Sequence, residues 1–124
     1  MAVRVAICDD DEDFRDLMAT AIRADADLEL VATAPALQPL LHALPAVTVD
    51  AVLLDWLMPD VDQEAAVREV RAALPDATIV VLTAVVRTSA AVRAVEAGAD
   101  GYVEKGPGAS LLLERCKALI VPAS

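Results

Sequence analysis

The stretch AVLLD, Ala51–Asp55, is apolar over its first four residues and ends in a single acid. A second run of this kind, TIVVLT at Thr78–Thr83, follows a segment with helical spacing and ends in a hydroxyl. Runs without alternation are typical of parallel strands that helices cover on both faces. These two stretches therefore predict the centre of a parallel sheet.

Three further runs extend this sheet. They are VRVAIC at Val3–Cys8, LELVAT at Leu28–Thr33 and GYVE at Gly101–Glu104. Helical patterns lie between the runs and after the last one, so the chain reads as five strand–helix pairs. This order indicates a doubly wound α/β fold, which binds its ligands beyond the carboxyl ends of the strands.

Apolar residues at helical spacing predict four of the helices, and an i,i+4 pair of Glu64 and Arg68 supports the third. The second helix, within APALQPLLHALP, is expected to be short or irregular because of its prolines. The apolar positions are Phe14, Leu17, Met18, Ala21 and Ile22 in the first helix, Val67, Val70 and Leu74 in the third, Val92 and Val95 in the fourth, and Leu112, Cys116, Leu119 and Ile120 in the fifth.

The bulk composition limits the classes of function. The 124 residues suffice for one domain, and 57% of them are hydrophobic while only 2% are aromatic. A core of this composition must be built from alanine, valine and leucine. The formal net charge of −10 argues against nucleic acid or an anionic membrane as a direct ligand of this chain.

Cysteine usage and the apolar segments indicate the compartment. Cys8 and Cys116 form no motif and are predicted to be buried free thiols, which suits a reducing environment. The N-terminal apolar run is broken by Asp9, so it does not resemble a signal peptide. The uncharged stretch from Val31 to Val49 contains three prolines, which argues against a spanning helix. We therefore expect a cytoplasmic protein without membrane association.

The ends of the predicted strands carry the chemistry. Asp9 and Asp10 follow the first strand, Asp55 ends the third, Thr83 ends the fourth and Lys105 follows the fifth. A carboxylate such as Asp55 can attack phosphorus, provided that a hard cation such as Mg²⁺ (or Mn²⁺) offsets the surrounding negative charge. Lys105 would then hold one phosphate oxygen and Thr83 another.

Four stretches together resemble the receiver domain of response regulators in two-component signalling. They are AICDDDEDFR, VLLDWLMPD, VVLTA and GADGYVEKG. The resemblance covers essentially the whole chain, so residues 1–124 are expected to form a single receiver domain, with 121–124 as the start of a linker to an output domain. It implies a flavodoxin-like fold with the strand order 2-1-3-4-5.

The resemblance also implies a role for each residue at the strand ends. A sensor histidine kinase would phosphorylate the chain, which would catalyse only its own phosphorylation and dephosphorylation. The fourth helix, fifth strand and fifth helix would then switch, controlling an output such as transcription through a separate DNA-binding domain or a homodimer. The implied roles are Asp55 as phosphoacceptor; Asp9, Asp10, Asp55 and the Leu57 carbonyl as metal ligands; Thr83, the Ala84 amide and Lys105 as phosphate contacts; and Tyr102 as the switch aromatic.

Several structural interpretations compete with these roles. Asp55 could be a turn residue, Thr83 an ordinary strand-end hydroxyl, Lys105 a surface amine and Tyr102 a packing aromatic. Asp11–Asp13 are interpreted as an acidic helix start. Trp56 is expected to be partly exposed beside the site. Gln63 stands where the family usually has glycine, so the loop before the third helix must be built without one.

Two other classes of function remain open. A phosphatase of the haloacid dehalogenase type also uses an aspartyl nucleophile. Such an enzyme normally needs a second acid two residues further on, to protonate the leaving group, and Leu57 occupies that position here. A receiver-like interaction module would switch without phosphate. If the chain is a receiver, Leu57 and Val85 flank the path of the water that hydrolyses the acyl phosphate. Both are apolar, so we expect a long-lived phosphoryl group.

Overall fold

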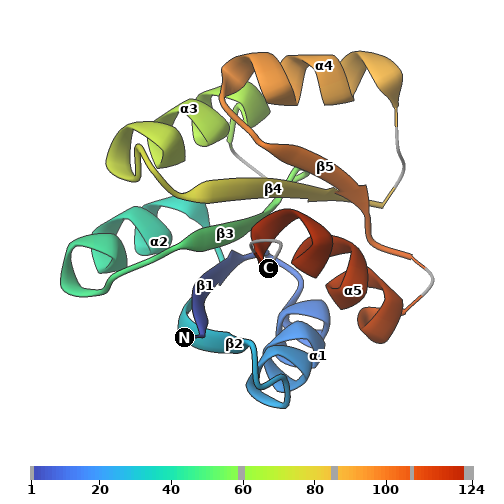
Figure 1. The fold of residues 1–124 in the computed structure, drawn as a ribbon. Coiled ribbons are helices and arrows are strands. Elements are labelled where there is room, and N and C mark those ends of the chain that lie inside the picture. The colour runs from blue at the N-terminus through green and yellow to red at the C-terminus, as the bar shows by residue number, and fades with distance from the viewer. Residues whose placement is uncertain (1, 59–60, 85–86, 107, 122–124) are drawn as a thin grey trace.

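The computed structural model describes residues 2–58, 61–84, 87–106 and 108–121. Its centre is a five-stranded parallel sheet in the order β2-β1-β3-β4-β5 (Figure 1), which confirms the predicted flavodoxin-like order. Four strands have the predicted bounds, and β2 continues one residue further, to Ala34. The strands are β1 Val3–Cys8, β2 Leu28–Ala34, β3 Ala51–Asp55, β4 Thr78–Thr83 and β5 Gly101–Glu104.

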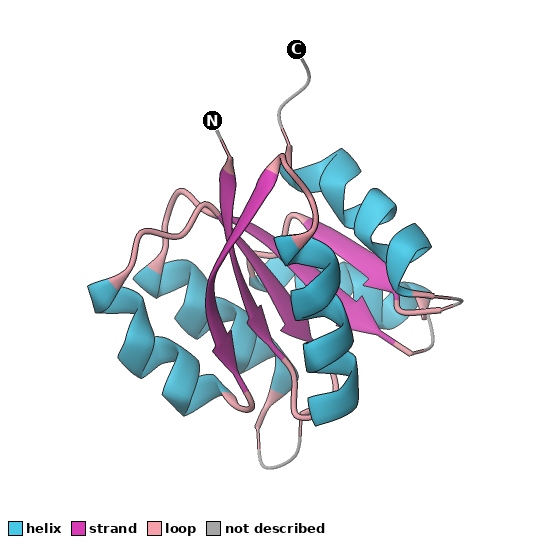
Figure 2. Ribbon diagram, turned by 90° about the horizontal axis from the view of Figure 1, so that it is seen from below, coloured by secondary structure: helices cyan, strands magenta, loops and turns pink. Residues whose placement is uncertain are grey.

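Helices cover both faces of the sheet, as Figure 2 shows from below. Helices α1 and α5 lie on one face, and α2, α3 and α4 lie on the other (Figure 1). The helices are α1 Glu12–Arg23, α2 Leu37–Ala43, α3 Gln63–Ala73, α4 Thr88–Ala97 and α5 Ala109–Ile120, and a short 3₁₀ helix, η1 at Leu44–Ala46, follows α2.

The sheet separates two apolar cores because successive side chains of a strand point to opposite faces. In β1, Val5 and Ile7 pack with α1 and α5, whereas Ala6 and Cys8 pack with the helices of the other face. All five residues of β3 are buried, as expected for a central strand. Cys8 and Cys116 are free and buried, as predicted.

Side-chain caps start two of the helices at the carboxyl edge of the sheet. The Asp11 carboxylate accepts a hydrogen bond from the Phe14 amide at 3.2 Å, which confirms the interpretation of the acidic run as a helix start. Asp62 does the same for Ala65 at 2.9 Å. Gln63, which stands where the family usually has a glycine, is therefore the first residue of α3, and the helix begins directly after the Asp62 cap.

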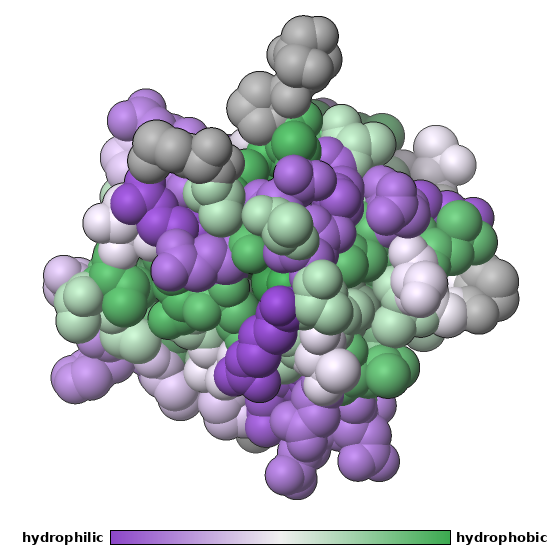
Figure 3. All heavy atoms as spheres, turned by 60° about the horizontal axis from the view of Figure 1, so that its bottom comes forward, coloured by the Kyte–Doolittle hydropathy of each residue, from purple (hydrophilic) through white to green (hydrophobic). Residues whose placement is uncertain are grey.

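The predicted helices form, but four of the apolar positions that predicted them are exposed to solvent. Leu17, Val92, Val95 and Leu119 are between 43% and 55% exposed. In α4 the inward positions are held by Ala90 and Ala94, whose small side chains let the helix approach the sheet closely. Figure 3 shows apolar areas between groups of hydrophilic side chains on the face that carries β2 and α1. The helical spacing of these four residues thus predicted the helices correctly without showing which side chains face the sheet.

Arg71 joins three segments at the edge of the fold. Its guanidinium donates hydrogen bonds to the Gly98 carbonyl at 2.8 Å and the Ala77 carbonyl at 2.6 Å. It also contacts Asp100 Oδ2 at 2.6 Å, and that oxygen accepts a further hydrogen bond from the Ile79 amide. The end of α3, the start of β4 and the loop before β5 therefore depend on one side chain.

We expect Arg71→Met to lower the free energy of unfolding by about 2–3 kcal/mol, because several carbonyls lose a charged donor at once. Arg68→Met is the matched control on the same helix. Arg68 lies 3.9 Å from Glu64 and is more than half exposed, so its removal should change stability by less than about 0.5 kcal/mol. Urea denaturation measures both variants, and equal effects would contradict the role given to Arg71.

Candidate functional site

Three carboxylates from two neighbouring strands meet at the carboxyl edge of the sheet. Asp9 and Asp10 directly follow β1, Asp55 ends β3, and these strands are paired in parallel. Each residue offers one carboxylate oxygen, and the three oxygens lie within 4.8 Å of one another. Oxygen ligands of this kind suit a hard divalent cation. The structure thus brings the predicted metal-binding acids together.

Lys105 reaches the same site from the far side of β4. Its Nζ lies 2.7 Å from Asp9 Oδ2 and 3.3 Å from Asp55 Oδ1. Its backbone amide donates to the Thr83 carbonyl at 2.8 Å, which fixes the start of the loop after β5. The side chain is only 20% exposed, so Lys105 is not a free surface amine.

The backbone around Asp9 fixes its carboxylate. Asp9 is buried, its amide donates to the Ala34 carbonyl at 3.0 Å, and its Oδ1 accepts a hydrogen bond from the Asp11 amide at 2.9 Å. The Arg15 guanidinium donates to the Asp9 carbonyl at 2.8 Å. Asp10 is exposed at the rim. The acidic run is therefore divided between the site, which holds Asp9 and Asp10, and the cap of α1.

Burial raises the pKa of Asp55 to about 6. Burial is the largest cause of this rise; a hydrogen bond with Asp10 and the negative charge of Asp9 also contribute to it, while Lys105 opposes it. The Leu57 amide also donates to Asp55 Oδ1, at 3.3 Å. Crowding of negative charge thus stabilises the protonated form of Asp55, and a bound cation would favour the carboxylate.

This pKa predicts a pH dependence of stability. The ordinary pKa of 3.8 applies to the unfolded chain, so between about pH 4 and 6 the folded protein holds a proton that the unfolded chain releases. Wild-type stability relative to Asp55→Asn should therefore fall as pH rises through this window, by on the order of 2 kcal/mol, and level off above it.

Denaturation in metal-free buffer at several pH values measures this difference. Asp25 beside Lys117 and Asp50 beside Arg4 have lowered pKa values, which make stability rise with pH. Both proteins share these two groups, so the difference isolates Asp55. A difference that stays constant from pH 4 to 7 would contradict the raised pKa.

Thr83 ends β4, the strand next to β3 and Asp55, and Tyr102 lies in β5. Thr83 is buried at the end of its strand. The Tyr102 hydroxyl is buried and has no hydrogen-bond partner among the described residues. Its ring meets the Trp56 ring edge to face, with the centroids 6.1 Å apart. Trp56 is buried, at 5% exposure, and not partly exposed as predicted, because it packs into the core beneath α2, α3 and α4.

Sequence reasoning missed Phe14. Its ring lies under Lys105, with Nζ 4.4 Å from the ring centroid. The chain has one phenylalanine, one tryptophan and one tyrosine. Phe14 contacts Lys105, and Trp56 and Tyr102 contact each other. The placement of such rare residues next to strand-end charges was the available signal, since Phe14 follows Asp10 closely and Trp56 follows Asp55 directly.

For the other predicted site residues, the structure gives exposure but no contact that tests their roles. The Leu57 side chain is 59% exposed beside the site. Ala84 is exposed directly after β4. Val85 lies outside the described residues. The metal-binding role of the Leu57 carbonyl and the phosphate-binding role of the Ala84 amide stay predictions.

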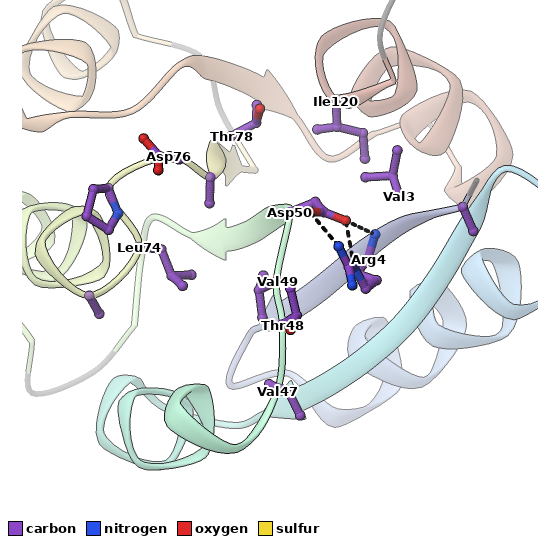
Figure 4. A pocket seen from close by; sticks show the side chains of 14 residues that line it. Val3, Arg4, Val47, Thr48, Val49, Asp50, Leu74, Asp76, Thr78 and Ile120 are labelled. Atoms are coloured by element: carbon purple, nitrogen blue, oxygen red, sulfur yellow. Dashed lines mark hydrogen bonds and ion pairs between the residues drawn. The ribbon is translucent and has the colours of Figure 1, made fainter.

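A hollow of about 670 Å³ lies at the opposite, amino edge of the sheet (Figure 4). It is lined by the starts of β1 and β4, the segments that precede β3 and β4, and the end of α5. Arg4 and Asp50 form an ion pair at 3.0 Å in its wall. Asp9, Asp10 and Asp55 do not line this hollow, so it is separate from the candidate site.

None of the described helices combines the length and the apolar character that a membrane span requires.

Comparison with known proteins assigns this chain to a family. The family model described as the response regulator receiver domain matches residues 5–117. The response regulator protein VraR of Staphylococcus epidermidis is 29% identical over 110 residues, which cover 89% of this chain and 53% of that protein. The DNA-binding transcriptional activator DevR/DosR of Mycobacterium tuberculosis is 29% identical over 133 residues, covering 96% and 61%. The chain thus spans about half the length of these relatives.

Solved structures agree in fold. A CheY-like receiver domain from Methanospirillum hungatei superposes with a TM-score of 0.82 at 22% identity, covering 95% of this chain and 93% of that one. A LuxR-family two-component response regulator from Aurantimonas superposes with a TM-score of 0.86 at 26% identity, covering 97% and 86%. The sheet and its covering helices are therefore shared along nearly the whole chain.

Proposed function

Because this chain belongs to the response regulator receiver domains, we propose that Asp55 accepts a phosphoryl group from a partner histidine kinase. The observation that supports this most is the group of three carboxylates within 4.8 Å, with the Lys105 ammonium 3.3 Å from Asp55. A carboxylate that can act as the nucleophile, acids that can hold a cation and an amine that can bind phosphate thereby lie close together, which supports the proposal. One of the relatives, DevR/DosR, is a DNA-binding transcriptional activator, so the proposed output is transcription through a separate domain.

In the proposed reaction an Asp55 oxygen attacks the phosphorus of a phosphohistidine. The P–N bond breaks, its electron pair returns to the imidazole, and an aspartyl phosphate forms. Mg²⁺ (or Mn²⁺), held by Asp9, Asp10 and Asp55, would supply the positive charge that lets a phosphoryl dianion approach. Lys105 adds a second positive charge, and the Thr83 hydroxyl can donate to a phosphate oxygen. Phosphoryl transfer needs mainly such positioning and charge.

The proposed switch uses Tyr102. Its buried hydroxyl has no hydrogen-bond partner among the described residues, which is unfavourable and lowers the cost of moving the ring to a second position where the hydroxyl is hydrogen-bonded. Movement of Thr83 toward a phosphate on Asp55 would change the space around Tyr102 and bias that equilibrium. The surface formed by α4, β5 and α5 would carry the change to an output domain or to a second copy.

Incubation with acetyl phosphate tests the proposal without a kinase. The wild-type chain should gain one acid-labile phosphoryl group, visible as a retarded band on a phosphate-affinity gel, and should not turn over a generic phosphoester. Turnover of the ester would favour the phosphatase alternative. Failure to label in the presence of Mg²⁺ would favour an interaction module that works without phosphate.

The phosphoryl group should also be long-lived. We expect Leu57→Asn to speed its loss by a factor of about three to ten, because an amide beside Asp55 can orient the attacking water. Val85→Glu should act in the same direction. Leu17→Asn, at an exposed leucine on α1, is the control and should leave the rate unchanged. Decay followed after removal of acetyl phosphate decides the matter, and unchanged or slower decay in Leu57→Asn would overturn the idea.

A further inference from the structure

We infer that Phe14 is a positioning residue that holds Lys105 in place for phosphoryl transfer, an inference that rests on the proposed function. The Lys105 Nζ lies 4.4 Å from the centre of the Phe14 ring. An ammonium over an aromatic face is attracted by the negative charge density of that face. Phe14 is the only phenylalanine of the chain, and Lys105 is one of only two lysines.

Among the described residues, the Lys105 ammonium contacts three attractive partners. Asp9 Oδ2 lies at 2.7 Å, Asp55 Oδ1 at 3.3 Å, and the Phe14 ring forms the third side. The ammonium carries three N–H groups, and the side chain is only 20% exposed. Lys105 is therefore enclosed by two carboxylates and one ring.

The three partners differ in what happens to them during the proposed reaction. Asp9 and Asp55 are the groups expected to bind the cation and the phosphoryl group, so their attraction for Lys105 changes as the site is loaded. The ring of Phe14 binds neither a hard cation nor a phosphate oxygen. It can hold the ammonium throughout, without competing for either group, and thereby limits the freedom of a long and flexible side chain.

The local structure places this ring. The Asp11 cap accepts a hydrogen bond from the Phe14 amide, so Phe14 stands in the first turn of α1 at the carboxyl edge of the sheet. The ring is partly buried against the core between the sheet, α1 and α5. A leucine at this position would keep the apolar contact with the core but would lose the aromatic face.

The first test is the position of Lys105 in the metal-free protein, observed by NMR. Protons above an aromatic face are shifted upfield, so the Lys105 ε-methylene signals should lie upfield of those of Lys117, the other lysine, which binds Asp25 and Asp27. Phe14→Leu should move the Lys105 signals to the position of the Lys117 signals, and Phe14→Tyr should leave them shifted. Lys105 signals that are the same in the wild type and in Phe14→Leu would overturn the inference.

The second test is the rate of phosphorylation by acetyl phosphate at saturating Mg²⁺. Phe14→Leu should lower the rate by about three- to tenfold, and Phe14→Tyr should stay within about twofold of the wild type. In a Lys105→Met background, Phe14→Leu should have no further effect, because the ring then has no ammonium to hold.

Two kinetic results would overturn the inference. One is a Phe14→Leu protein as fast as the wild type, and the other is an equal slowing by Phe14→Leu in the Lys105→Met background. If the wild-type chain accepts no phosphoryl group at all, the proposed function fails, and the NMR comparison then decides separately whether Phe14 holds Lys105.

Discussion

Asp55→Asn should abolish labelling by acetyl phosphate, with a loss of at least about 100-fold, because an amide cannot act as the nucleophile. The structure gives a second reason for a large effect. Asp55 is one of three carboxylates that can hold a cation, and its replacement weakens that site as well. The fold should remain intact, since the substitution removes a charge from a crowded and mostly buried group.

Asp76→Asn is the matched control for this substitution. Asp76 is exposed and lines the hollow at the amino edge of the sheet, away from the carboxylate group. Its replacement removes the same charge and should leave labelling unchanged. Retention of labelling in Asp55→Asn would remove the basis of the proposed function, whereas loss of labelling in both variants would point to an effect of net charge.

Lys105→Met should have two large effects. First, it should slow phosphorylation by about 100-fold, because a charged group that contacts the phosphate in the transition state is lost. Second, it should lower the free energy of unfolding in metal-free buffer by about 3 kcal/mol. Asp9 is fully buried, and its carboxylate would be left with the Asp11 amide but without its positive partner.

Lys117→Met is the matched control, because Lys117 also binds two carboxylates but lies far from the site along α5. Its partners are Asp25 at 2.8 Å and Asp27 at 3.1 Å. We expect this variant to phosphorylate at the wild-type rate. Labelling kinetics and urea denaturation measure both variants. If Lys105→Met proved as stable as the wild type, the ion pair with Asp9 would contribute little to the fold.

The fold was predictable because apolar runs and segments with helical spacing alternate regularly along the sequence. Uninterrupted apolar runs such as AVLLD and TIVVLT are typical of parallel strands, and helices between such strands restrict the fold to a few α/β topologies. The acids, hydroxyl and amine at the strand ends then identified the site, since parallel strands bring their carboxyl ends to one edge. Asp9, Asp10, Asp55 and Lys105 lie together in the structure as that reasoning required.

What the sequence did not show concerns side-chain direction. Val92 and Val95 share a helix with alanines, and spacing alone does not say whether the large or the small residues face the sheet. In α4 the alanines do, since they allow a closer approach. The burial of Trp56 and the contact of Phe14 with Lys105 depend on packing between segments far apart in the chain. Local sequence carries no direct record of such contacts.

Mapping the phosphorylated residue in the wild-type chain tests the central claim most directly. The chain would be incubated with acetyl phosphate in Mg²⁺ and, separately, in excess chelator, and the acyl phosphate would be trapped by borohydride reduction before peptide mass spectrometry. We predict a reduced residue at position 55 in the Mg²⁺ sample and none in the chelated one. A modification at any other residue, or equal modification of Asp55 without the metal ion, would contradict the claim.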